Sequence, residues 1–139
     1  DWHGSDGMNF PRSRQEFPLL DQGMSALITD LHERGLDKHV SVVLWGEFGR
    51  TPKINKNAGR DHWCACYSSV LAGGGIQGGS IYGRSDKHAA YVADLPVTPY
   101  DMHATILHAF GVSESATVTD SQGREVRITD GTPVKALFS

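Results

Sequence analysis

The heptapeptide His39–Trp45, HVSVVLW, constrains the fold more than any other stretch of the chain. It is apolar almost throughout and rich in β-branched residues. A continuous apolar run of this kind is typical of a strand that is covered on both faces within a parallel sheet. A helical pattern directly precedes it, so the sequence predicts the helix–strand half of an α/β crossover unit.

Two segments show the three- and four-residue spacing of an amphipathic helix. The apolar positions of the first are Phe17, Leu20, Met24, Leu27, Ile28 and Leu31. We expect Pro18 in its first turn and Gly35 at its end. The second segment is TPYDMHATILHAFG, where Thr98 is the expected N-cap, Pro99 the first helical residue and Gly111 the stop.

Further strands are expected at Tyr67–Ile76 and, as a short edge strand, at Gly79–Gly83. The alternation in REVRIT predicts a hairpin strand after a turn around Asp120–Gly123. The order of elements predicts a single domain over residues 1–139, an α/β layered sandwich with a mostly parallel sheet and a small C-terminal hairpin. In such folds the chemistry is expected in loops at the carboxyl ends of the strands.

The composition argues against some classes of partner. The 139 residues carry a formal net charge of -3 and a pI near 6.1, so no basic stripe is expected to bind nucleic acid or an anionic membrane. No apolar run approaches the roughly 20 residues of a membrane span. The chain opens at Asp1 without a methionine or a signal peptide, so we expect a piece of something longer, cut or processed at its N-terminus.

The stretch GEFGRTPKINKNAGRDHW, residues 46–63, follows the apolar strand and contains hardly any hydrophobic side chains. Long irregular loops within compact domains are usually either functional or disordered. Glu47 and Arg50 lie at its start. The Arg50 guanidinium suits phosphate, sulfate or carboxylate, although a Glu–Arg surface pair explains the two residues equally well.

Two Asp–His pairs are candidate metal ligands. Asp1 and His3 are two residues apart, so on extended backbone their side chains point the same way and can share one divalent cation. Asp61 and His62 end the polar loop and can act as a ligand with its orienting neighbour. A polar terminus and a structural Asp–His pair are the plainer alternatives. His88, in a polar loop, is a minor ligand candidate.

Five segments in order carry a resemblance to a known family: DWHG, FPLLDQGMSALITDLHERGL, VVLWGEFGRTPKINKNAGRDHW, LAGGGIQGGSIYGRSD and PVTPYDMHATILHAFGV. They resemble the C-terminal part of a bacterial family catalogued as domain of unknown function 1501, placed among the alkaline phosphatase and sulfatase-like proteins. The resemblance implies a partial alkaline phosphatase-like α/β sandwich, whose loops hold two metal ions, usually zinc, around a Ser, Thr or formylglycine nucleophile.

The resemblance also implies roles for individual residues. Asp1 and His3 are similar to the pair that binds one metal, and His62 is similar to the final histidine of that site. Glu47 falls where the superfamily has the aspartate of a DHG motif, but Phe48 stands in place of the following histidine. The second site is therefore impoverished or rebuilt, with Asp61 or His88 as the replacements.

Two functions follow from these expectations. The first is a fragment of a metal-dependent hydrolase of phosphate or sulfate esters, with Arg50 binding the anion and a divalent metal, zinc before manganese or calcium, as cofactor. Its nucleophile would lie upstream of Asp1, so a missing N-terminal segment or self-association would complete the site. The alternative is a degenerate binding or scaffold module for a sulfated or phosphorylated polymer or a partner protein. A third reading gives the loop only structural hydrogen bonds. The resemblance also implies a periplasmic or cell-envelope location.

Overall fold

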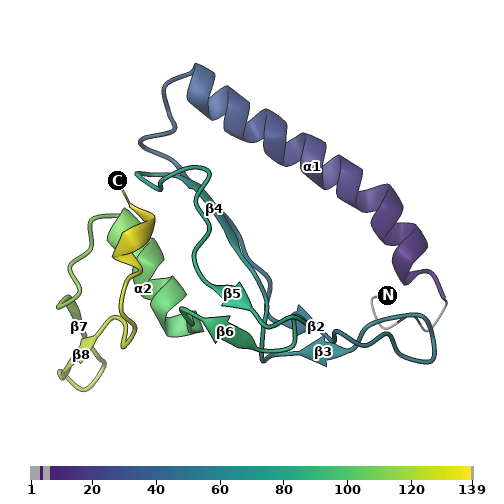
Figure 1. Ribbon diagram of the computed structural model, residues 1–139. Coiled ribbons are helices and arrows are strands. Elements are labelled where there is room, and N and C mark those ends of the chain that lie inside the picture. The colour runs from purple at the N-terminus through teal and green to yellow at the C-terminus, as the bar shows by residue number, and fades with distance from the viewer. Residues whose placement is uncertain (1–3, 5–6, 139) are drawn as a thin grey trace.

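The computed structural model describes residue 4 and residues 7–138 of the chain (Figure 1). The helices are α1 (Asn9–Glu33), α2 (Pro99–Ala109) and the short 3-10 helix η1 (Lys135–Leu137). The strands are β1 (Ser41–Leu44), β2 (Gly49–Arg50), β3 (His62–Trp63), β4 (Val70–Gly73), β5 (Arg84–Ser85), β6 (Val92–Asp94), β7 (Thr117–Thr119) and β8 (Glu125–Arg127). No helix in the described residues combines the length and the apolar character needed to cross a membrane.

Helix α1 begins at Asn9, so the expectation that Pro18 lies in its first turn was wrong. Pro18 lies inside the helix, where the ring lacks an N–H donor and crowds the preceding turn at a cost of roughly 3 kcal/mol. Gly23 adds about 1 kcal/mol relative to alanine. The predicted stop is confirmed, because Gly35 has a φ of 67° and its N–H donates to the carbonyl of His32. Helix propensity alone does not stabilise α1.

The expected parallel sandwich is wrong. The strands described here form four separate two-stranded sheets, β1–β4, β2–β3, β5–β6 and β7–β8, and all four are antiparallel. A parallel pair needs a long crossover, usually helical. Between β1 and β4 the chain instead folds back through the β2–β3 hairpin, and β4 returns beside β1 with Ser41 opposite Gly73 and Leu44 opposite Val70. The result is a small mixed α/β structure.

Helix α2 matches its sequence pattern closely. Thr98 and Asp101 form a reciprocal capping box, Pro99 is the first helical residue, and Gly111 follows the end of the helix. The carboxylate of Asp101 also accepts a hydrogen bond from the N–H of Thr132 at 2.8 Å. These contacts tie the start of α2 to the C-terminal segment.

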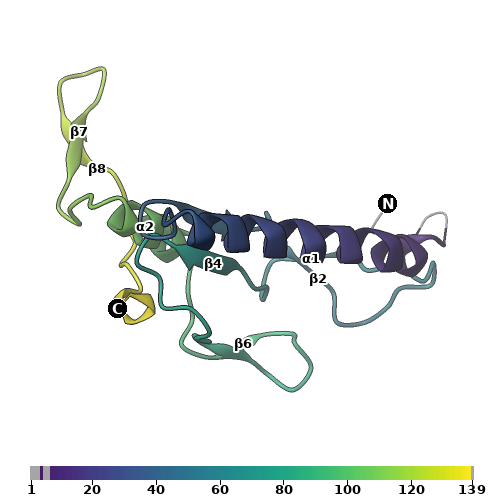
Figure 2. The same cartoon turned by 90° about the horizontal axis from the view of Figure 1, so that it is seen from above.

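The hairpins occupy the periphery. The turn predicted at Asp120–Gly123 is confirmed between β7 and β8, which project away from the other elements in Figure 2. The edge strand expected at Gly79–Gly83 does not form, and the next strand starts at Arg84. Gly79 and Gly83 have φ values of 74° and 75°, which extended strands do not adopt.

One tryptophan joins two of the hairpins. Trp63, in β3, donates its indole N–H to the carbonyl of Ala90 at 2.6 Å, and its ring lies edge-on to Tyr91 at 5.6 Å between centroids. Ala90 and Tyr91 precede β6 in the β5–β6 hairpin. The contact fixes that hairpin beside the end of the polar loop.

Candidate functional site

The β2–β3 hairpin brings the two ends of the polar loop together. Arg50 lies directly opposite His62, and Gly49 lies opposite Trp63. Side chains of directly opposed residues in an antiparallel pair share one face of the sheet. Arg50 and His62 therefore meet across a hairpin and not at the carboxyl end of a parallel sheet.

Phe48 completes a three-residue stack with this pair. Its ring centroid lies 4.0 Å from that of His62, and the guanidinium carbon of Arg50 lies 5.5 Å from the Phe48 centroid. A cation near an aromatic face is attracted by the ring quadrupole. Phe48 thus contacts both the imidazole and the guanidinium.

One nitrogen of this arginine has no acceptor within the described part of the chain. Nη1 of Arg50 is buried and makes no hydrogen bond there. A buried polar group without a partner costs about 1–3 kcal/mol, and more when it is charged. Most buried polar atoms are paired, so an exception points to strain, function or an absent partner. An anion beside His62 would supply the acceptor.

The polar loop is rigidly hydrogen-bonded through Asn55. Its side-chain oxygen accepts from the backbone N–H groups of Asn57 and Gly59, both at 3.0 Å, and its amide donates to Asp61 at 2.9 Å. Arg60 reinforces the loop through its Nη1, which donates to the carbonyls of Thr51 and Pro52 at 2.6 and 2.7 Å. The structural hydrogen bonds of the third reading are therefore present. They hold the loop in a fixed shape.

Gly4 is buried against this loop. A Cβ added to it would lie 2.6 Å from the backbone nitrogen of Gly59 and also clash with the carbonyl oxygen of Asn57, and its φ is 76°. Only glycine fits such a position. Gly4 is thus packed against the backbone of the polar loop at Asn57 and Gly59.

The predicted metal ligands are only partly brought together. Asp1 and His3 lie outside the described residues. Glu47 is exposed, and Asp61 is the exposed residue directly before β3. Within residue 4 and residues 7–138, no three His, Cys, Asp or Glu side chains are grouped as a metal site. His88, the minor candidate, lies in the turn of the β5–β6 hairpin.

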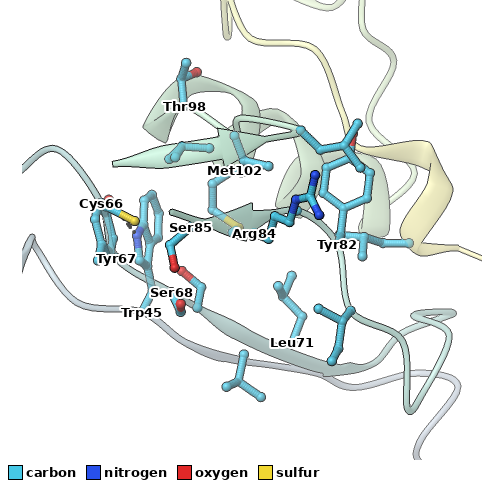
Figure 3. A pocket seen from close by; sticks show the side chains of 18 of the residues that line it. Trp45, Cys66, Tyr67, Ser68, Leu71, Tyr82, Arg84, Ser85, Thr98 and Met102 are labelled. Atoms are coloured by element: carbon cyan, nitrogen blue, oxygen red, sulfur yellow. Dashed lines mark hydrogen bonds between the residues drawn. The ribbon is translucent and has the colours of Figure 1, made fainter. Parts of the chain in front are cut away.

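A separate cavity lies between β4, the β5–β6 hairpin and α2, with a volume of about 540 Å³. Figure 3 shows Trp45 and Tyr67 at one end of it and Tyr82 and Arg84 at the other. The indole of Trp45 donates to the hydroxyl of Tyr67 at 3.1 Å. Arg50 and His62 do not line this cavity.

Sequence reasoning missed three features of the site. It did not foresee the stacking of Phe48 on His62, the central role of Asn55, or the burial of Gly4. The two-residue spacing of Phe48 and Arg50 was a usable signal for a shared face. The Asn55 hydrogen bonds reach residues two to six positions away, whereas the Gly4 contacts join the N-terminus to Asn57 and Gly59, a pairing that no local pattern encodes.

The fold and the site define a small mixed α/β protein with a hairpin-mounted arginine–histidine pair beside a rigid polar loop. The chain belongs to the family described as "Protein of unknown function (DUF1501)", whose family pattern matches residues 1–138. No curated protein and no solved structure matches the chain.

Proposed function

We propose that the β2–β3 hairpin and its loop form the anion-binding half of a metal-dependent site that hydrolyses phosphate or sulfate esters. The observation that carries the proposal is Nη1 of Arg50, which is buried without an acceptor among the described residues, on a residue that pairs with His62 across the hairpin. A guanidinium and an imidazole side by side suit a tetrahedral oxyanion. The substrate would be a small anionic ester or a sulfated or phosphorylated polymer.

The metal in this proposal depends on the N-terminal residues. The described residues alone do not group three ligands, so a divalent cation, zinc first, would need Asp1 and His3 together with His62. Gly4, the residue after His3, packs on the polar loop, which supports this arrangement. Glu47 and Asp61 are the remaining candidate ligands. A bound metal would act as a Lewis acid on an ester oxygen.

A second candidate function is a non-catalytic module that binds the same anions. Phe48 favours it, because its ring covers the imidazole of His62 and offers no metal ligand. Under this reading Arg50 still binds the anion, but no metal is held and no ester is cleaved.

The first experiment measures metal content after dialysis against zinc, in wild type and in the His62→Ala variant. The hydrolase proposal expects bound zinc in wild type and a loss of it in the variant. Equal zinc in both proteins would contradict it. The control is His32→Ala, because His32 lies on α1 and contacts Asp37 at 2.8 Å, away from the loop.

The second experiment separates the two functions. Turnover of aryl phosphates or sulfates, lost in Arg50→Ala, supports the hydrolase. Sulfate binding without metal and without turnover supports the binding module. An affinity for sulfate that Arg50→Ala leaves unchanged refutes both. The matched control is Arg14→Ala, which removes one exposed arginine from α1.

A further inference from the structure

The cavity between β4, the β5–β6 hairpin and α2 is not used by the proposed anion site. Its volume of about 540 Å³ falls within the range of about 300–1,000 Å³ that is typical of small-molecule sites. The β5–β6 hairpin, which forms one wall, is held in place by the 2.6 Å hydrogen bond from Trp63 to Ala90. The shape of this wall is therefore set by contacts within the described chain.

One end of the cavity is a fixed aromatic surface. Trp45 and Tyr67 lie at this end in Figure 3. The hydrogen bond from the indole N–H of Trp45 to the Tyr67 hydroxyl, at 3.1 Å, orients both side chains. The indole is still 38% exposed, so its ring can contact a ligand. Side chains of this kind offer an apolar ring together with a polar group.

Two opposite charges lie on the hairpin wall. Arg84 is opposite Asp94 across the β5–β6 pair, so the two side chains share one face of the hairpin. Nε of Arg84 and Oδ2 of Asp94 are 3.8 Å apart, which is too long for a hydrogen bond. Within the described residues neither side chain makes a hydrogen bond. A donor group and an acceptor group are thus available next to each other.

The rest of the lining is uncharged. Arg84 and Asp94 are the charged residues among those that line the cavity, so its formal charge is balanced. Ser68, Ser69 and Ser85 add hydroxyl groups to the wall. A balanced charge favours a neutral ligand, and an adjacent donor and acceptor suit hydroxyl groups, because each hydroxyl can both accept and donate.

We propose that this cavity binds a short neutral saccharide of one or two hexose units. The C–H face of one sugar ring packs on the Trp45–Tyr67 pair. Two neighbouring hydroxyls meet the hairpin wall, where one accepts a hydrogen bond from the Arg84 guanidinium and the other donates to the Asp94 carboxylate. Hydrogen bonds to charged groups are stronger than those between neutral groups. The proposal does not use Arg50 or His62 and is independent of the anion site.

Another segment of polypeptide is the rival occupant of the cavity, and the charges argue against it. Apolar side chains that filled the space would bury Arg84 and Asp94 without hydrogen bonds, which is costly for charged groups. Sugar hydroxyls supply those hydrogen bonds. The experiment is made on the full-length protein, including any residues that precede Asp1, so that such a segment would be present and would exclude the sugar.

The test is isothermal titration calorimetry with six sugars: glucose, galactose, mannose, cellobiose, lactose and maltose. At least one is expected to bind with a dissociation constant of about 1 mM or tighter. Arg84→Ala should weaken that sugar at least about tenfold, because charged donors are lost. Asp94→Asn, a change of similar shape, should also weaken it. Arg124→Ala is the matched control, since Arg124 also contacts an aspartate, Asp120 at 2.8 Å, but does not line the cavity.

Tryptophan fluorescence locates the bound sugar. Binding should change the emission of wild type, and Trp45→Phe should abolish this change while it retains an aromatic ring in the cavity. Thermal melts check that each variant is folded. The proposal is overturned if none of the six sugars binds to wild type. It is also overturned if Arg84→Ala binds as tightly as Arg124→Ala, or if the fluorescence change persists in Trp45→Phe.

Discussion

Arg50 and His62 lie directly opposite each other across the β2–β3 hairpin, and Phe48 packs against both. The pairing of two short strands thus places Arg50 opposite His62 where the two ends of the polar loop meet. Neither side chain depends on a distant element for its position relative to the other. The consequences for anions, for the loop and for pH can each be measured.

Replacing Arg50 by methionine should have opposite effects with and without anions. Without an anion, the variant removes a buried donor that has no acceptor in the described chain, so its stability should equal or exceed that of wild type. Sulfate should raise the melting temperature of wild type only, since binding at 100 times the dissociation constant stabilises by about 2.7 kcal/mol. Thermal melts in sulfate and chloride at equal ionic strength measure this. A similar sulfate response in both proteins would refute the role of Arg50.

Replacing Asn55 by alanine should loosen the polar loop. The variant removes two hydrogen bonds from backbone N–H groups and one to Asp61, at a cost of about 2 kcal/mol. Urea unfolding measures the loss. Asn57→Ala is the control, because only the backbone N–H of Asn57 takes part in this network. Equal stability of the two variants would show that Asn55 does not organise the loop.

Replacing Gly4 by alanine should disrupt the packing of residue 4 on the polar loop. Both Gly4 and Gly7 have positive φ values, 76° and 68°, but a Cβ on Gly7 meets open space. Both alanine variants therefore incur similar backbone strain of about 1 kcal/mol, and only Gly4→Ala adds a clash with backbone atoms. Gly4→Ala should accordingly be the less stable by at least about 1 kcal/mol. Differential scanning calorimetry of the pair tests this, and equal melting temperatures would contradict the packing of Gly4.

Under the proposed function, the same pair of variants has a second readout. If Asp1 and His3 reach His62 through the anchor at Gly4, Gly4→Ala should lower zinc content while Gly7→Ala preserves it. Zinc content unchanged in both variants would show that the packing of Gly4 does not affect metal binding.

The start of α2 should respond to acid. The N–H of Thr132, followed by the hydroxyl and N–H of Thr98, donates to Asp101 and lowers the pKa of its carboxyl below the usual value of 3.8. Because the pKa of this carboxyl is lower in the folded than in the unfolded state, its ionised form stabilises the fold at pH values above the unfolded pKa. That stabilisation is lost as the pH falls from about 4 through the folded pKa. Asp101→Asn should cost about 1 kcal/mol at pH 7.

The measurement is the stability difference between wild type and Asp101→Asn from pH 7 down to pH 2. The difference should shrink below about pH 4, where the wild-type carboxyl becomes protonated. A difference that stays constant over this range would refute the electrostatic part of the cap.

The sequence predictions were correct where the contacts join residues close in sequence, and they failed where the contacts join residues far apart. The cap and stop of α2 and the turn at Asp120–Gly123 were correct because neighbouring residues make those hydrogen bonds. The start of α1 was misplaced because Pro18 was taken as a first-turn residue. The direction of β4 relative to β1 depends on the path of 25 intervening residues, 45–69, which no local pattern reveals. The parallel-sheet expectation failed for that reason.

The sequence analysis grouped two residues of the candidate site for a reason that the fold does not support. Arg50 and His62 were grouped because both were expected at the carboxyl edge of a parallel sheet, whereas a two-residue hairpin ladder pairs them. Residues 46–63 supplied the residue types of the site. The pairing of Arg50 with His62 depends on how the loop between them folds, and Asn55 makes hydrogen bonds within that loop. The ligation expected of Asp1, His3, Glu47 and Asp61 remains a prediction.

The indole of Trp63 gives the site an optical reporter. It follows His62 directly in β3 and is fixed by its hydrogen bond to Ala90 and by the ring of Tyr91. Its fluorescence emission therefore depends on an environment one residue from the imidazole. In a variant with Trp2 and Trp45 replaced by phenylalanine, sulfate or zinc arriving at His62 can be followed by the colour and intensity of this single fluorophore.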